Sequence, residues 1–368
     1  MSKAVPEMLR PFLELMAERD ASDLHLKVEA PPALRIRGTL MRLRGEPMTQ
    51  EGIEEMFFPL LMDTQLKFYN EHGSLDLGIT LTGIGRFRVN MFRQRGAISI
   101  AVRRVHRLIR SFQELHLPPV LADVARNNQG LVIVAGVTGS GKSTTLAAMI
   151  ELINRERQCH IVTVEDPIEY LYEDDHAIVN QREVGIDVPT FGEALKYVVR
   201  ADPDVILIGE MRDTQSFVTG MEAAETGHLV FGTLHTATAP QTLERILNFF
   251  PSERHRLVRQ TLSFTLRAII CQRLLPAIDP KVGLVPSVEI LLNTPSIRKL
   301  IVDAEDAKLG DAIRIGHEEG MQDFTESLRT LVMEGLVDRR VAFNYAPSVE
   351  ALKMALKGIH GGEGGLLA

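Results

Sequence analysis

The first hundred residues alternate short helical and strand patterns. Residues 7–19 place apolar side chains on one side of a helix, and residues 24–38 alternate apolar and polar positions, as strands with one solvated face do. Residues 51–62 again predict a helix, and residues 75–105 return to alternating strands. We therefore expect a small α+β domain over residues 1–107.

Beyond this domain the hydrophobic pattern changes. Pro118 and Pro119 cannot continue a helix or a strand, and buried apolar strands such as 131–136 and 204–209 then alternate with longer helical stretches. That alternation is typical of a parallel sheet covered on both faces. From about residue 240 the pattern is mostly amphipathic helix. The expected organisation is a linker at 108–119, an α/β core at 120–275, a helical subdomain at 276–359 and a flexible glycine-rich tail at 360–368.

Composition narrows the classes of protein. Acidic residues outnumber basic ones, 48 to 41, so the net charge is −7, and a nucleic-acid partner is not expected. Cys159 and Cys271 stand far apart, which argues against a disulfide framework or a zinc site and favours a reducing cytoplasm. The apolar runs are shorter than the roughly 20 residues of a spanning helix. We expect membrane association only through partners.

The strongest local signal is GVTGSGKST at residues 136–144, between an apolar strand and a helix-forming stretch. It fits the phosphate-binding pattern G-x-x-x-x-G-K-[ST], in which backbone N–H groups surround the phosphates of ATP. In this pattern Lys142 reaches the β- and γ-phosphates and Ser143 ligates Mg²⁺. The expected nucleotide-binding residues are Gly136, Thr138, Gly139, Ser140, Gly141, Lys142, Ser143 and Thr144.

A phosphate loop needs a carboxylate at the end of a second buried strand, to manage the metal and the attacking water. The strand at 204–210 carries Gly209 where an aspartate is usual, which leaves Glu210. Another apolar strand runs into Glu165 and Asp166. Our hypothesis is that Glu210 and Glu165 divide metal-water coordination and general-base work. The alternative is that Glu165 and Asp166 only cap the next element.

Two histidines flank the strand after residue 228. A histidine near a strand is more often a satisfied core group than a catalyst. His235, however, follows the strand end, which is the rim where open α/β sheets bind ligands. We expect His235 to sense the γ-phosphate, and for His228 the two interpretations are balanced.

These stretches together resemble the secretion-superfamily ATPases of type II secretion and type IV pili. The phosphate loop at 136–143, an acidic box at 161–170, an atypical Walker B strand at 204–210 and a histidine box at 228–235 occur in the family's order. DASDLHL at 20–26 looks like the start of the family's PAS-like N-terminal domain. The resemblance implies a RecA-like core with a PAS-like α+β domain and a helical C-terminal part.

Within the superfamily the chain is most similar to the pilus retraction, or twitching-motility, ATPases. It lacks the tetracysteine module of the extension and secretion ATPases and carries GEMRD at 209–213. SIRKLIVD at 296–303 departs from the retraction motif at Ser296 and Asp303, which leaves room for an accessory retraction paralogue. The resemblance implies a homohexameric Mg²⁺-dependent ATPase that works at the inner-membrane platform protein and the pilus base.

Residues 77–113 hold eight arginines and no carboxylate. This excess can be a solvated basic face, a nucleic-acid surface without the usual aromatic stacking set, or a surface that meets the nucleotide of a neighbouring subunit. Arginine stabilises charge that develops on a γ-phosphate. The family resemblance favours this third interpretation and matches Arg88 and Arg103 to it. Two rival functions remain open, a nucleotide-dependent scaffold that hydrolyses little and a nucleic-acid motor.

Overall fold

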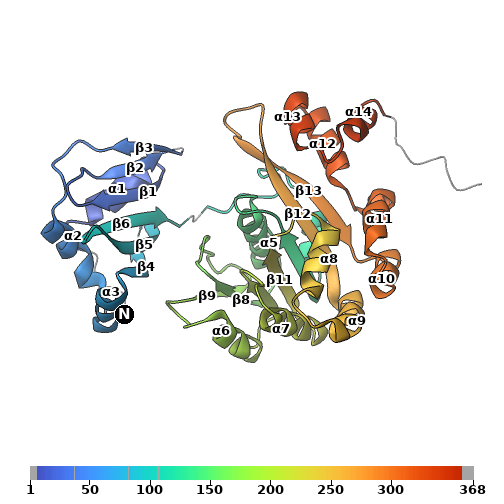
Figure 1. Cartoon of the computed structure of the whole chain (residues 1–368), viewed down its shortest axis with the longest axis horizontal. Coiled ribbons are helices and arrows are strands. Elements are labelled where there is room, and N and C mark those ends of the chain that lie inside the picture. Colours follow the sequence, from blue (N-terminus) through green and yellow to red (C-terminus); the bar gives the residue numbers. More distant parts are fainter. Residues whose placement is uncertain (1–5, 37, 82, 106–107, 359–368) are drawn as a thin grey trace, which may run out of the picture. The chain divides into compact units, whose positions relative to one another are not determined.

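The computed structural model describes residues 6–36, 38–81, 83–105 and 108–358, and it divides into two compact units (Figure 1). The first unit comprises residues 1–108 with 168–171, and the second comprises 109–167 with 172–368. The expected flexible tail at 360–368 lies outside the described residues.

The first unit is built on an antiparallel sheet of six strands in the order β3-β2-β1-β6-β5-β4. Strands β1 and β6 lie at its centre, although 69 residues separate the end of one from the start of the other in the sequence: Lys27 ends β1 and Ala97 begins β6. The elements are α1 (Arg10–Glu18), β1 (Ala21–Lys27), β2 (Ala33–Ile36), β3 (Thr39–Arg42), α2 (Gln50–Phe57), α3 (Asp63–His72), β4 (Ser74–Leu81), β5 (Gly85–Gln94) and β6 (Ala97–Arg104).

Alternation along β5 separates the core of this unit from its polar face. Phe87, Val89 and Met91 are fully buried and pack with α1 and α2. Arg86 precedes Phe87, and Arg88 lies between Phe87 and Val89. Successive side chains of a strand point to opposite faces. Arg86 and Arg88 are therefore displayed on the face of the sheet that points away from the core.

The second unit holds a sheet of seven strands in the order β13-β12-β7-β11-β10-β8-β9, parallel except for β13. Its strands are β7 (Gly130–Ala135), β8 (His160–Glu165), β9 (Ile178–Glu183), β10 (Val205–Ile208), β11 (Leu229–Leu234), β12 (Leu266–Pro276) and β13 (Leu284–Leu292). Its helices are α4 (Val120–Ala125), α5 (Lys142–Glu156), α6 (Phe191–Val198), α7 (Thr214–Glu225), α8 (Ala239–Leu247), α9 (His255–Thr265), α10 (Pro295–Val302), α11 (Leu309–Ile315), α12 (Phe324–Met333), α13 (Arg339–Tyr345) and α14 (Val349–Leu356).

Helices cover both faces of this sheet. On β7, Leu131 and Ile133 pack with residues of α6 to α12 on one face, and Val132 and Val134 pack with α4 and α5 on the other. A strand buried on both faces must be apolar at every position, which explains the uninterrupted apolar run of β7. The predicted doubly covered α/β sheet is confirmed.

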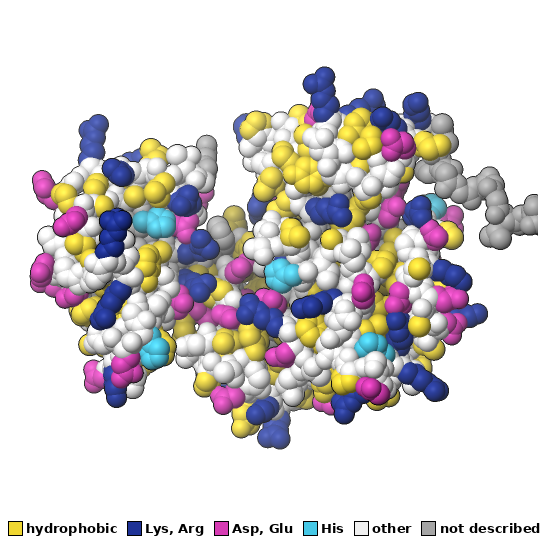
Figure 2. Space-filling view, viewed as in Figure 1, with side chains coloured by type: hydrophobic (Ala, Val, Ile, Leu, Met, Phe, Trp, Pro, Cys, Tyr) yellow, Lys and Arg dark blue, Asp and Glu magenta, His cyan; other side chains and the backbone are white. Residues whose placement is uncertain are grey.

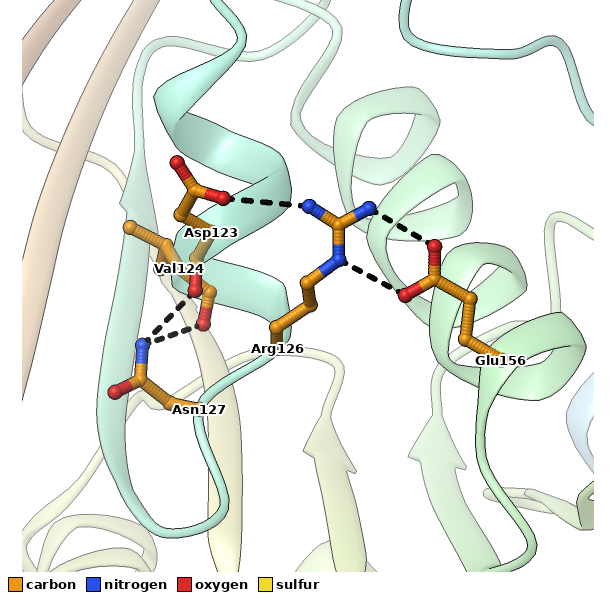
Figure 3. A network of polar contacts seen from close by, with 5 residues as sticks. All are labelled: Asp123, Val124, Arg126, Asn127 and Glu156. Atoms are coloured by element: carbon orange, nitrogen blue, oxygen red, sulfur yellow. Dashed lines mark hydrogen bonds and ion pairs between the residues drawn. The ribbon is translucent and has the colours of Figure 1, made fainter.

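Helix α4 is tied to α5, the helix that follows the phosphate loop (Figure 3). Arg126 donates two hydrogen bonds of 2.9 Å to the carboxylate of Glu156 and lies 3.3 Å from Asp123. These bonds hold the pKa of the Glu156 carboxyl below its usual range. Asn127 donates to the carbonyl groups of Asp123 and Val124 and so satisfies the end of α4.

The expectation of mostly helix after residue 240 is wrong over two segments. Strands β12 and β13 pair antiparallel and extend the core sheet, and β13 lies inside the stretch 276–359 that was expected to be helical. Short apolar runs fit a buried strand and a buried helix equally well. From Pro295 onward the described chain is helical, as expected.

The surface shows neither a bilayer-spanning helix nor a single-sign charge field on the side in view. Among the described residues, no helix combines the length and apolar character that a membrane span requires. On the face drawn in Figure 2, acidic and basic side chains are interspersed over the second unit.

Candidate functional site

The phosphate loop connects the carboxyl end of β7 to the first turn of α5. Lys142 opens the helix and is 9% exposed. Its Nζ donates to the carbonyl oxygens of Gly136 at 2.8 Å and Val137 at 3.2 Å. The loop thus holds the lysine ammonium group beside its own backbone, at the positive end of the helix.

The eight residues expected to bind nucleotide form one continuous turn. Thr138 and Gly139 are exposed at its tip, Ser140 is buried beneath it, and Ser143 and Thr144 are half-buried in the first turn of α5. Gly141 has a φ of 88°, a left-handed conformation that favours glycine.

Three of the expected catalytic side chains follow neighbouring strands of the sheet. Glu165 ends β8, Glu210 lies just beyond β10, and His235 follows β11. These strands are adjacent and parallel, and β11 also pairs with β7. Because parallel strands end at the same edge, this edge carries the phosphate loop, both carboxylates and His235.

Gly209 has a structural explanation in the close approach of β10 to β8. A Cβ atom at this position would lie 3.0 Å from the carbonyl oxygen of Val164 and 3.2 Å from Cα of Glu165. The carbonyl of Gly209 accepts a 2.6 Å hydrogen bond from Thr233 of β11. Gly209, which stands where an aspartate is usual, therefore allows Glu165 to lie directly beside β10, the strand that leads to Glu210.

Glu210 is held between two cationic or ionisable side chains. Its carboxylate accepts a 2.6 Å hydrogen bond from Arg212 and lies 3.5 Å from Nε2 of His235. The Arg212 guanidinium is the main cause of a pKa of Glu210 below its usual value, and His235 adds to it. A carboxylate with a lowered pKa is well suited to orienting water and cations and is a weak acceptor of protons.

Glu165 is held by a different set of partners. Its Oε1 accepts hydrogen bonds from Thr163 at 2.6 Å and from Gln181 of β9 at 3.1 Å, and the residue is buried. Glu210 is the more accessible of the two carboxylates.

The structure does not bring His228 to this site. It precedes β11, at the amino end of the strand, and a six-residue strand is about 20 Å long. Its Nδ1 lies 2.8 Å from the carbonyl oxygen of Ala223 at the end of α7. Within one chain His228 is a satisfied structural histidine, which is the common role of a histidine beside a strand.

The oxygen groups at this edge fit a magnesium ion that is held mainly by nucleotide. Magnesium usually keeps several waters and takes one or two carboxylates together with substrate phosphates. Ser143, Glu165 and Glu210 offer such oxygens. Within the described ranges, no three His, Cys, Asp or Glu side chains form a group that could hold a metal alone.

A cavity of about 310 Å³ opens beside the first turn of α5. The hairpin between β12 and β13, the start of α5 and the segment before α4 form its walls. Its lining residues are Arg110, Glu114, Leu115, Leu117, Gly141, Thr144, Thr145, Gln272, Leu274, Val282, Gly283, Leu284 and Pro286. A cavity with mixed apolar and polar walls next to a phosphate loop is suited to the base and ribose of a nucleotide.

Arg88 and Arg103 are paired across β5 and β6 in the first unit. Arg103 bonds Asp23 at 2.8 Å, and Arg88 lies 3.4 Å from Asp76. Aspartates outside the arginine-rich segment thus partly neutralise it. The two side chains start from paired positions on one face of the sheet, and each guanidinium group is directed to an aspartate of its outer neighbouring strand, Arg103 to β1 and Arg88 to β4. Arginines on one face can bind an anion.

Several residues of this site were missed in the sequence. Arg212 bonds Glu210, Gln181 bonds Glu165, and Asp23 holds Arg103. Gln272 bonds the phosphate loop. An uncharged amide within the mostly apolar run LRAIICQRLL was a signal for Gln272, whereas the partners of the other contacts follow only from the fold.

Comparison with known proteins agrees with this geometry. Residues 2–334 match the family described as type II/IV secretion system protein. The chain is 41% identical to the type IV pilus retraction ATPase PilT of Pseudomonas aeruginosa over 90% of its own length and 96% of the relative's. It is 40% identical to the type IV pilus ATPase PilU of the same bacterium, over 94% of its own length and 90% of the relative's.

The fold agrees as well. The crystal structure of the pilus retraction motor PilT with bound ADP superposes with a TM-score of 0.87 at 38% identity, and it covers 95% of this chain and 99% of that one. The resemblance seen in the sequence is therefore confirmed. The chain belongs to the family of type II/IV secretion system proteins.

Proposed function

We propose that the chain is an ATP-hydrolysing motor that retracts type IV pili by removing pilin subunits at the pilus base. The observation that carries the proposal is similarity to PilT along nearly the full length of both chains, together with a phosphate loop beside two carboxylates. The rival interpretation as a weakly hydrolysing scaffold rested on Gly209. The close packing of Gly209 against β8 gives that residue a structural reason and weakens the rival.

The proposed mechanism assigns a role to each side chain at the sheet edge. The phosphate loop and Lys142 bind the β- and γ-phosphates of ATP, and Ser143 supplies a hydroxyl for Mg²⁺, which offsets phosphate charge. Glu210 and Glu165 orient the attacking water, and His235 contacts the γ-phosphate region. The lowered pKa of Glu210 favours an orienting role for this residue. The cavity beside α5 accepts the base and ribose.

We further propose a homohexamer in which the two units of each chain move about the 108–119 linker as ATP is bound and hydrolysed. In this ring the paired Arg88 and Arg103 act on the nucleotide of a neighbouring subunit. The motor works at the inner face of the cytoplasmic membrane and reaches it only through the platform protein. The similarity to PilU favours a second candidate, an accessory retraction ATPase that cooperates with a paralogue.

Steady-state ATP hydrolysis by the purified full chain tests the enzymatic part. Lys142→Ala removes the phosphate contact and Glu210→Ala removes the water-orienting carboxylate, so each should lower turnover at least 100-fold. Arg314→Ala is a matched control, because this exposed surface arginine lies outside the site and pairs with Asp311 in the same helical turn. Turnover that survives in Lys142→Ala or Glu210→Ala would overturn the site assignment.

A further inference from the structure

Gln272 is a buried polar side chain on β12, a strand that follows the histidine segment in the sequence and pairs with β7. It lies on β12, is 3% exposed, and follows Ile269, Ile270 and Cys271, which are fully buried. A primary amide in such surroundings costs free energy unless its polar atoms are hydrogen-bonded. Its bonding partners therefore indicate why an amide occupies this position.

Both ends of the amide bond the phosphate loop and its helix. Nε2 donates to the carbonyl oxygen of Ser140 at 2.8 Å, and Oε1 accepts from the hydroxyl of Thr145 at 2.7 Å. The loop and Gln272 lie 132 residues apart in the sequence. One side chain of β12 thus joins the loop to the first turn of α5.

The bond to Ser140 fixes the direction of one peptide group. A peptide is planar and trans, so its C=O and N–H point in opposite directions. Because the carbonyl of Ser140 is turned toward Gln272, the N–H of Gly141 is turned away from β12. In this loop pattern, backbone N–H groups must face the phosphates.

The shape of Gly141 agrees with this arrangement. A Cβ atom on Gly141 would lie 2.6 Å from Nε2 of Gln272, which is closer than real contacts allow. The glycine is therefore required both by its φ of 88° and by the approach of the Gln272 amide. The loop and the amide are fitted to each other.

We propose that Gln272 is a positioning residue that orients the Ser140–Gly141 peptide, so that the N–H of Gly141 faces the nucleotide phosphates before they bind. This inference rests on the proposed function only in that the loop binds ATP. Without the amide, the buried carbonyl of Ser140 loses its donor, and an unsatisfied buried carbonyl is costly. The peptide then rotates among several orientations, and phosphate binding must select one of them.

The test is equilibrium binding of ADP and of inorganic pyrophosphate to the purified full chain. Gln272→Leu removes both bonds. Gln272→Glu keeps an acceptor for Thr145 and, as a carboxylate, loses the donor to Ser140. Thr145→Val is the matched control, because it removes the Thr145 bond and leaves the Gln272 donor. The unfolding temperature of each ligand-free variant is measured in parallel.

We expect Gln272→Leu and Gln272→Glu to weaken ADP and pyrophosphate binding by similar factors of at least ten. Thr145 also lines the cavity proposed for the base and ribose, so the control is read with pyrophosphate, which has neither. The pyrophosphate affinity of Thr145→Val should stay within threefold of that of the unaltered chain. In ATP hydrolysis by the two Gln272 variants, KM should rise by a larger factor than kcat falls. The reason is that the Ser140–Gly141 peptide of these variants has no fixed orientation until the nucleotide binds. A merely structural role would lower the unfolding temperature and leave pyrophosphate affinity unchanged.

Unaltered pyrophosphate affinity in folded Gln272→Leu, or equal losses in Thr145→Val and Gln272→Leu, would overturn the inference. If Gln272→Leu does not fold, Gln272→Asn serves in its place, since its shorter amide cannot make both bonds. Binding is measured without turnover. A chain that binds ADP through Gln272 but hydrolyses no ATP would therefore refute the proposed function and leave this inference standing.

Discussion

Gly209 is the residue at which this chain departs from the usual form of a phosphate-binding protein. The sequence alone leaves two interpretations of the missing aspartate, a damaged catalytic site or a redistributed one. The structure favours redistribution, because the absent Cβ makes room for the backbone of Val164 and Glu165. In the mechanism we propose, Glu165 of the neighbouring strand supplies the carboxylate that this strand lacks.

The variant Gly209→Ala tests this explanation. A methyl group 3.0 Å from the carbonyl of Val164 requires the backbone of β8 to give by a few tenths of an ångström. Since this backbone lies inside the buried sheet, we expect the change to destabilise the chain by about 1–3 kcal/mol. It should also lower ATP turnover, because Glu165 is displaced. Gly192→Ala is a matched control in helix α6, where a Cβ meets nothing within 4 Å and the change should stabilise by about 0.5–1 kcal/mol. Equal stability and turnover in Gly209→Ala would contradict the account.

Strand β13 and helix α8 are joined by a hydrogen bond to a buried carboxyl group. Glu289 of β13 is 8% exposed and accepts a 2.7 Å hydrogen bond from the N–H of Ala239, the first residue of α8. Helix α8 begins four residues after His235, so this bond anchors the end of the histidine segment. Burial is the main cause that raises the pKa of Glu289 to about 7, and Asp323 adds to it, while the Ala239 bond and Arg273 lower it.

This pKa predicts how stability depends on pH. The folded chain holds a proton on Glu289 up to about pH 7, whereas the unfolded chain releases it near 4.3. The contribution of this group to the free energy of unfolding therefore falls as pH rises between these values. Glu289→Gln keeps an acceptor for Ala239 and cannot ionise. We measure the free energy of unfolding of both chains by chemical unfolding at pH 5 and at pH 8. From pH 5 to pH 8, the free energy of unfolding of the variant should rise by about 1–3 kcal/mol relative to that of the unaltered chain. A difference that does not change with pH would contradict this.

Patterns within single elements predicted much of the fold. Strands that run into Glu165, Glu210 and His235 were visible because each apolar run ends in polar residues. Strands β12 and β13 were missed, since their apolar runs also fit buried helices. Contacts such as Gln272 with Ser140, or Arg103 with Asp23, join residues 132 and 80 positions apart. Such pairs follow from the strand order, which local periodicity does not specify.

At the scale of the whole molecule, the paired arginines predict cooperation between subunits. Arg88→Ala subunits retain the phosphate loop and Glu210, and Glu210→Ala subunits retain the arginines. Mixed rings should therefore contain some interfaces at which Arg88 of one subunit faces the phosphate loop and Glu210 of its neighbour. ATP turnover of the mixed rings should then exceed that of either variant alone. Native mass spectrometry would verify mixed rings. Mixed rings that show no recovery at any ratio would argue against action of Arg88 across the subunit boundary.

The central claim is that ATP hydrolysis at this phosphate loop removes pilins from the pilus. The most direct measurement replaces the native gene with the Lys142→Ala form and counts surface pili together with twitching motility. We expect pili to accumulate on the surface while twitching stops. The unaltered gene should restore the normal number of surface pili and twitching motility. Loss of surface pili, or unchanged pili and twitching, would contradict it.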